Sequence, residues 1–111
     1  MIGQRYLTDV VILSPRGALM GGPETTEFRL TLESLLADGL KKVVVDLKDV
    51  RWVNAAGIGI LIETLNRLRE TKGDLRLANC CGRIGHLFKL LKMDTLFQHF
   101  DSLDTALSSF A

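Results

Sequence analysis

The sequence predicts an α/β fold, in which about five strands form a mixed sheet and four helices pack against it. Strand-like and helix-like hydrophobic patterns alternate along the chain. The connections between them are short, which favours right-handed crossovers and helices that cover the sheet. The chain has 111 residues, of which 47% are hydrophobic and 24% charged, and it contains no repeat or linker. We therefore expect a single domain over residues 1–111.

The N-terminal segment predicts a hairpin followed by a loop. Residues 6–13 are rich in β-formers and are interrupted by a polar pair at residues 8–9, which indicates two short strands. Residues 16–23 end in Gly-Gly-Pro, so we expect a loop there.

A first helix is predicted from Pro23 to about Asp38. Proline is favoured in the first turn of a helix, and Gly39 supplies a stop signal after the last turn. The side chains expected to be buried are Phe28, Leu32, Leu35 and Leu36.

The middle of the chain predicts a buried strand and a long helix. Residues 43–47 begin with three consecutive β-branched valines and end in leucine, which is typical of a strand covered on both faces. A helix opens at residues 55–57 after a short loop, and we expect Gly73 to end it. Its predicted core-facing stripe is Ile58, Leu61, Ile62, Leu65 and Leu68.

The last third of the chain predicts a strand, a helix, an edge strand and a final helix. Residues 74–78 alternate as a strand, and residues 95–100 are interpreted as the edge strand. Asp101 is expected to cap the last helix. The apolar stripes of the two helices are Ile84, Leu87, Phe88 and Leu91, and then Leu103, Ala106, Leu107 and Phe110.

Composition and charge exclude several classes of function. The net charge is +1, and a near-neutral chain lacks the basic surface that nucleic-acid binding requires. The longest apolar stretch, residues 53–62, is far shorter than the about 20 residues that span a bilayer, so we expect no direct membrane insertion. The N-terminus lacks the pattern of a secretion signal, which favours a cytoplasmic protein.

Few residues suit catalysis or metal binding. His86 and His99 are the only histidines, and no cysteine or carboxylate stands at ligand spacing from them, so we expect no metal and no cofactor. The chain has no Gly-x-Ser-x-Gly motif, and we predict that it is not an enzyme. Cys80 and Cys81 are adjacent, which disfavours a disulfide between them. We interpret them as reduced packing residues near a strand end.

The opening of the second helix is the most informative segment. Helix N-termini favour anions, including phosphorylated side chains, and Asn54 is the only good capping residue in the window. Alanine stands at positions 55 and 56, where serine or threonine would be natural. Gly57 and Gly59 suit either a phosphate site or close packing of the helix on the sheet, and we favour packing.

The sequence resembles the STAS-domain family, and specifically the bacterial anti-sigma factor antagonists. The likeness extends over almost the whole chain, and the order and spacing of its motifs make it specific. The segments that carry it are residues 17–24, 43–47, 53–59, 73–79 and 100–107.

The resemblance implies a small cytoplasmic binding module, a monomer or weak dimer, rather than an enzyme. Members of the family bind an anti-sigma factor that is also a serine kinase, and thereby free the sigma factor. The kinase phosphorylates a serine that maps onto Ala56, and a neighbouring serine maps onto Ala55. An aspartate common in the early loop is replaced here by residues 20–21 (Met-Gly). We therefore expect a module that serine phosphorylation does not switch at this site.

We expect the partner surface to include the loop before the second helix, the first turn of that helix, and the early loop beside it. Trp52 either anchors this surface or shields the core, and both alternatives stay open. Thr25, Thr26 and Thr64 are other possible phosphate acceptors, although we interpret each as an ordinary helix-surface residue. The predicted surface consists of Arg51, Trp52, Asn54, Ala55, Ala56, Gly57, Ile58 and Gly59, with Gly21, Gly22 and Thr25 beside them.

Two other functions fit the sequence. The chain could be a STAS structural or regulatory subunit of a transporter or of a stressosome-like complex, in which alanines at the serine positions present no difficulty. It could also bind a small molecule or nucleotide at the Gly57 helix end. The identity of a captured partner separates the first of these from an anti-sigma factor antagonist, and a ligand titration tests the second.

Overall fold

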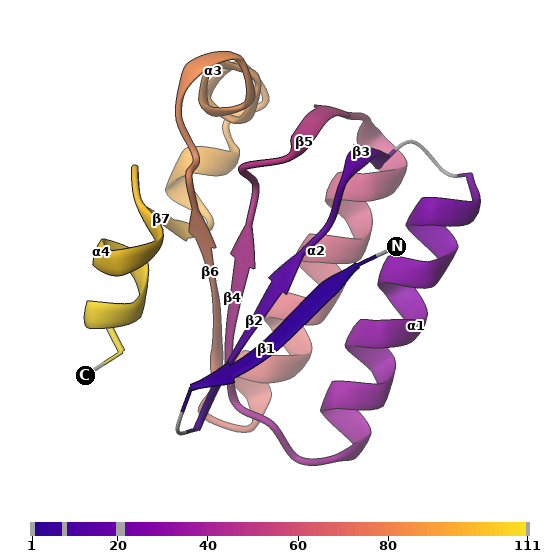
Figure 1. The fold of residues 1–111 in the computed structure, drawn as a ribbon, viewed down its shortest axis with the longest axis vertical. Coiled ribbons are helices and arrows are strands. Elements are labelled where there is room, and N and C mark those ends of the chain that lie inside the picture. The colour runs from indigo at the N-terminus through magenta and orange to yellow at the C-terminus, as the bar shows by residue number, and fades with distance from the viewer. Residues whose placement is uncertain (1, 8, 20–21, 111) are drawn as a thin grey trace.

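The computed structural model describes residues 2–7, 9–19 and 22–110, with the side chain of Glu24 excepted, and shows a mixed sheet with helices on both faces (Figure 1). The helices are α1 (Pro23–Ala37), α2 (Ala55–Glu70), α3 (Gly82–Leu90) and α4 (Leu103–Ser108), with a 3-10 turn η1 (Met93–Thr95). The strands are β1 (Gly3–Leu7), β2 (Val10–Ser14), β3 (Gly17–Leu19), β4 (Lys42–Asp46), β5 (Val50–Val53), β6 (Asp74–Ala78) and β7 (Gln98–His99).

The main sheet has five strands in the order β1-β2-β4-β6-β7. β1 and β2 form the predicted antiparallel hairpin, and the remaining neighbours pair in parallel. β3 and β5 form a separate two-stranded parallel sheet. The predicted α/β class, with a five-stranded mixed sheet and four helices, is confirmed.

The central strand β4 is covered on both faces, as its sequence predicts. Val43 and Val45 belong to the main core, which also includes the apolar faces of α1 and α2. Val44 belongs to a smaller cluster with Ala106 of α4 on the other face of the sheet. Figure 1 shows α1 and α2 on one face and α4 on the other. Because both faces are covered, the three central positions of the strand, residues 43–45, are all valine.

The two long helices begin and end close to the predicted residues. Pro23 occupies the first turn of α1, and Gly39 adopts a φ of +78° just beyond its end. At the end of α2 the left-handed residue is Lys72 (φ 66°), and Gly73 serves a different purpose from the predicted one. A Cβ at Gly73 would overlap the carbonyl oxygen of Lys41, so glycine here allows close approach of two backbones.

Several local predictions are wrong, and the short loop expected before the second helix contains β5. The predicted loop 16–23 contains β3, and the predicted edge strand 95–100 consists only of the two residues of β7, preceded by η1. The cap of α4 is Ser102 and not Asp101, because the Ser102 hydroxyl oxygen accepts a hydrogen bond from the Thr105 N–H at 3.1 Å. Leu91 lies beyond the end of α3 and is exposed, whereas the buried residues of that helix are Ile84 and Phe88.

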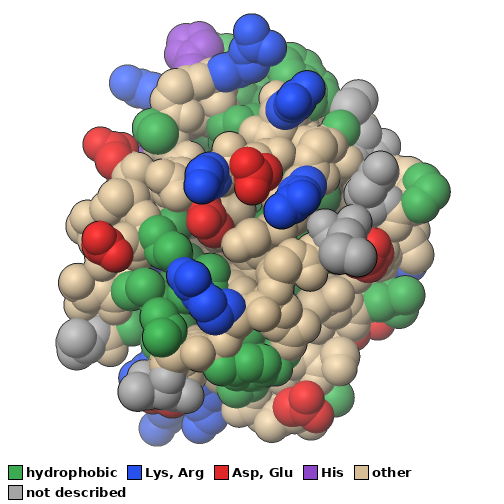
Figure 2. Space-filling model, viewed as in Figure 1, with side chains coloured by type: hydrophobic (Ala, Val, Ile, Leu, Met, Phe, Trp, Pro, Cys, Tyr) green, Lys and Arg blue, Asp and Glu red, His purple; other side chains and the backbone are tan. Residues whose placement is uncertain are grey.

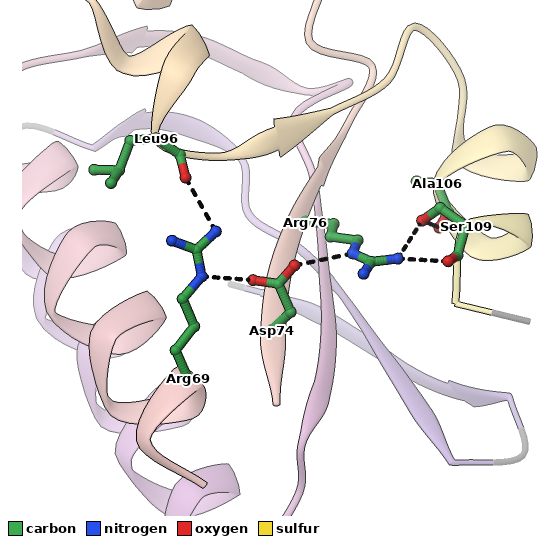
Figure 3. Close-up of polar contacts among 6 residues, drawn as sticks. All are labelled: Arg69, Asp74, Arg76, Leu96, Ala106 and Ser109. Carbon is green, nitrogen blue, oxygen red and sulfur yellow. Dashed lines mark hydrogen bonds and ion pairs between the residues drawn. The ribbon is translucent and has the colours of Figure 1, made fainter. Parts of the chain in front are cut away.

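A polar network fastens α4 and the end of α2 to β6 (Figure 3). The Asp74 carboxylate accepts from the Nε atoms of Arg69 and Arg76, at 3.2 and 3.0 Å. Arg76 also donates to the backbone oxygen of Ser109 at 2.6 Å, and its guanidinium lies 4.0 Å from the centre of the Phe110 ring. One half-buried arginine therefore holds the last helix against the sheet.

Candidate functional site

The first turn of α2 is capped as the sequence predicts. The Asn54 Oδ1 atom accepts hydrogen bonds from the N–H groups of Ala56 and Gly57, at 3.0 and 3.3 Å. The Asn54 backbone is extended, and its carbonyl accepts the first intrahelical bond from Ile58. Two of the N–H groups that a helix start leaves unpaired are thus satisfied within the chain.

The turn is also fixed to the small sheet. The Asn54 N–H donates to the carbonyl of Leu19 in β3 at 3.2 Å. A Cβ at Gly57 would overlap that same carbonyl oxygen and would lie 2.8 Å from Val53 Cγ2. Gly57 therefore allows the helix start to pack directly on β3 and β5, as the packing interpretation predicts. The structure gives it no room for a partner's backbone.

The outer side of the turn is open. Ala55, Ala56 and Gly59 are exposed, and nothing lies within 4 Å of a Cβ built at Gly59. The preceding strand exposes Arg51 and Trp52 together, and Trp52 is 43% exposed. All residues of the turn are described, and none of them is acidic. The chain's own residues leave this turn accessible to a partner.

The other residues of the predicted surface are placed less favourably. Ile58 is only 6% exposed and belongs to the core. Gly22 caps α1 through its backbone and is half-buried, and Gly21 lies outside the described residues, as does Met20. Thr25 is 3% exposed, so its side chain cannot line a surface.

The threonine prediction needs correction. Thr25 and Thr64 are buried residues of α1 and α2, whereas Thr26 is exposed as predicted. The Thr64 hydroxyl donates to the Ile60 carbonyl at 2.9 Å, and this hydrogen bond allows a polar side chain to lie on the buried face of the helix.

The two cysteines differ in environment. Both are free, but Cys80 is buried and Cys81 is exposed at the N-cap of α3. Burial raises the pKa of the Cys80 thiol to about 11, and the neighbouring Cys81 adds to this effect. The packing interpretation therefore holds for Cys80 and fails for Cys81.

A cleft that the sequence analysis did not single out adjoins Arg51. Its volume is about 490 Å³, and it lies where the β4–β5 connection meets the β6–α3 connection. The lining residues are Leu47, Lys48, Val50, Arg51, Asn79, Cys81, Arg83 and Ile84. The signal available in the sequence was the set of cations that follow parallel strands, since the carboxyl ends of such strands meet at one edge of the sheet.

No group of three or more metal-binding side chains occurs among the residues that the structure describes. A search of the helices within that same part of the chain finds none with the length and apolarity to cross a bilayer.

Comparison with known proteins gives one family and several relatives. The family model for the STAS domain matches residues 5–106. A curated relative, the anti-sigma-B factor antagonist of Staphylococcus aureus, is 27% identical over 70 residues. That match covers 63% of this chain and 65% of the relative, so it spans slightly less than two thirds of the relative's length.

Solved structures share the fold over nearly the whole chain. A Thermotoga maritima protein described as an anti-sigma factor antagonist superposes with a TM-score of 0.88 at 20% identity, covering 97% of this chain and 92% of the other. The phosphorylated form of the Bacillus cell fate determinant SpoIIAA gives 0.76 at 12% identity over 100% of each chain. A sulfate transporter family protein from Wolinella succinogenes gives 0.76 at 17%, covering 93% and 85%. At these identities the likeness concerns the fold alone.

Proposed function

The chain belongs to the STAS-domain family, and from that premise we propose that it binds an anti-sigma factor of the serine-kinase type and so releases a sigma factor. The relative in Staphylococcus aureus that is named an anti-sigma-B factor antagonist supports this proposal. The protein would act in the cytoplasm, by occupying its partner and not by catalysis.

The observation that carries the proposal is the open first turn of α2. Ala55, Ala56 and Gly59 face outward, with Arg51 and Trp52 exposed on the strand before them. Tryptophan and arginine are enriched among the residues that dominate binding energy at interfaces. The cap by Asn54 and the contact of Gly57 with β3 hold this surface in one shape, which lowers the entropic cost of binding.

We also propose that phosphorylation does not switch the protein at this turn. The first turn of α2 contains no hydroxyl group, and its exposed position 56 holds a methyl group. A phosphate there would add about −1.5 to −2 charges at neutral pH. The helix N-terminus tolerates that charge, so its inhibitory effect would arise at the partner's surface. Without an acceptor the protein stays competent to bind.

Binding is tested with the purified anti-sigma factors of the source organism, using calorimetry. We expect the wild-type protein to bind one of them and Ala56→Glu to weaken that affinity at least tenfold. The matched control is Asn66→Glu, which adds the same charge at an exposed position in the C-terminal half of the same helix. Equal affinity of Ala56→Glu and the wild type would place the docking surface elsewhere.

The absence of the switch is tested by intact-mass measurement after incubation with the anti-sigma factor and ATP. We expect no gain of mass for the wild type and a gain of one phosphate for Ala56→Ser. A stoichiometric phosphate on the wild-type helix end would contradict the proposal.

A second function is favoured by the same alanines. A STAS subunit of a transporter or of a stressosome-like assembly does not need a phosphorylatable serine, and the Wolinella transporter-family structure shares the fold. Affinity capture from the source organism, with identification by mass spectrometry, distinguishes the two. A kinase-fold partner supports the first function, and a membrane transporter supports the second.

A further inference from the structure

Two hollows are lined by β5 and by the connections around it, just before the start of α2 in the chain. The first is the cleft of about 490 Å³ described above, and the second, of about 630 Å³, lies next to β3. Lys48 and Arg51 line both of them, so the two hollows adjoin each other, and together they form an open depression. Arg51 also belongs to the surface proposed to bind the anti-sigma factor.

The depression is strongly basic. Arg16, Lys48, Arg51 and Arg83 line it and are all exposed. None of these four forms an ion pair with a residue that the structure describes. Asp49 is the exposed carboxylate among the lining residues, whereas the whole chain carries a net charge of only +1. Figure 2 shows lysine and arginine side chains gathered toward this end of the molecule, where α3 and β5 lie.

The nearby buried carboxylate of Asp46 forms no ion pair with these cations, and its hydrogen-bond partners are neutral donors. Asp46 Oδ1 accepts from the Lys48 backbone N–H at 3.0 Å and from Asn79 Nδ2 at 2.7 Å. Asn79 adopts a left-handed backbone conformation (φ 54°), which aims its amide toward Asp46 across the end of the sheet. The pair fixes the two connections that form the cleft relative to each other.

The backbone that carries the cations is held equally firmly. The Leu47 N–H donates to the backbone carbonyl of Ala78 at 3.0 Å, and the Gly17 N–H donates to the backbone carbonyl of Asp49 at 2.9 Å. The charged groups themselves remain in water at the rim of a rigid depression. Such an arrangement attracts and orients an approaching anionic surface more than it encloses a small ion.

We propose that this basic depression receives an acidic segment of the partner protein. The inference rests on the proposed function and adds the chemical character of the partner to it. Four exposed cations over an open surface match several carboxylates presented together by a protein, whereas a small anion would contact few of them at once. The proposal assigns Arg16, Lys48 and Arg83 to docking, in addition to the turn of α2.

The association rate tests the proposal. We expect Lys48→Glu/Arg83→Glu to lower the association rate constant for the anti-sigma factor at least tenfold in 20 mM salt, and this loss to shrink in 500 mM salt because the ions screen the charges. The matched control is Lys41→Glu/Arg67→Glu, which changes net charge equally at exposed positions away from the depression. The proposal would be overturned if both double variants associate more slowly by the same factor, or if neither associates more slowly than the wild type. The proposed function is decided separately, by the affinity of Ala56→Glu.

A second measurement keeps the proposal testable if no anti-sigma factor binds. Backbone amide shifts are followed by NMR during titration with a hexaglutamate peptide and, separately, with inorganic triphosphate. We expect the peptide to shift residues 47–51 and 79–84 in the wild type and not in Lys48→Glu/Arg83→Glu. The absence of such shifts, or saturable binding of triphosphate alone, would overturn the assignment to an acidic protein segment.

Discussion

At the scale of single residues, glycine and asparagine shape the site more than any charged group. Asn54 caps α2, as its position in the sequence predicts, because its side chain is well suited to that geometry. The role of Gly57 depends on a contact with Leu19, 38 positions earlier, which no local pattern contains. Sequence reasoning therefore identified the cap and favoured packing for Gly57 over ligand binding, but it could not identify the residue that Gly57 contacts.

The two glycines of the α2 start are expected to respond oppositely to alanine. Gly57→Ala should lower the free energy of unfolding by about 2–3 kcal/mol, because its Cβ overlaps the Leu19 carbonyl. Gly59→Ala should raise it by about 0.5–1 kcal/mol, since the site is open and alanine favours helix. Urea unfolding monitored by circular dichroism measures both. An unchanged free energy of unfolding for Gly57→Ala would show that the turn is not fixed to β3.

The thiols give a second prediction at this scale. Cys81 should react with a thiol reagent in the native protein at pH 8, whereas Cys80 should react only after unfolding, because it is buried and its pKa is raised to about 11. One label per native chain and two per unfolded chain is the expected stoichiometry. Two labels on the native protein would contradict the burial of Cys80.

The same shift makes stability depend on pH in the alkaline range. The native state holds the Cys80 proton up to about pH 11, whereas the unfolded chain releases it near its ordinary pKa of 9.0. The stabilisation is therefore complete below pH 9 and is lost as pH rises toward 11. Chemical unfolding between pH 8 and 11 should show a steeper loss of stability for the wild type than for Cys80→Ala. If the free energy of unfolding falls with pH equally in both proteins, Cys80 does not contribute to the pH dependence.

At the scale of elements, the small β3–β5 sheet explains most of what the sequence could not predict. Its strands have only three and four residues, and β5 exposes Arg51 and Trp52 in succession rather than alternating. A pattern of period two is therefore absent. The pairing of β3 with β5 presents Trp52 and fixes the turn of α2, which local sequence patterns do not reveal.

Arg76 holds the last helix through polar contacts, in addition to the apolar cluster around Ala106, and this yields a prediction for that element. Arg76→Ala removes the ion pair with Asp74 and the hydrogen bonds to Ser109, and should lower the free energy of unfolding by about 2 kcal/mol. Amide exchange should accelerate most in α4. Arg67→Ala, on the exposed face of α2, is the control and should change stability by about 0.5 kcal/mol or less. A uniform increase in exchange would show that α4 is not held locally.

At the scale of the whole molecule, hydrophobic period predicts the order of the long strands and helices along the chain, but not β3 and β5. The apolar run 43–47 predicts a strand covered on both faces, and the structure places helices on both sides of it. The basic depression was not predicted, because its cations come from the β2–β3 and β4–β5 connections, from β5 and from α3, which only the folded sheet brings together. The period of the hydrophobic residues is enough to predict the fold class, whereas the candidate surface depends on contacts between residues that are far apart in the sequence.

The most direct test compares the dissociation constant of the complex with the anti-sigma factor before and after long incubation with ATP. The account predicts an unchanged constant for the wild-type protein, because position 56 offers the kinase only a methyl group. It predicts that Ala56→Ser binds at first and then weakens at least tenfold under the same treatment. If the wild-type complex also weakens with ATP, the helix turn is not a permanently competent docking surface, and the central claim is wrong.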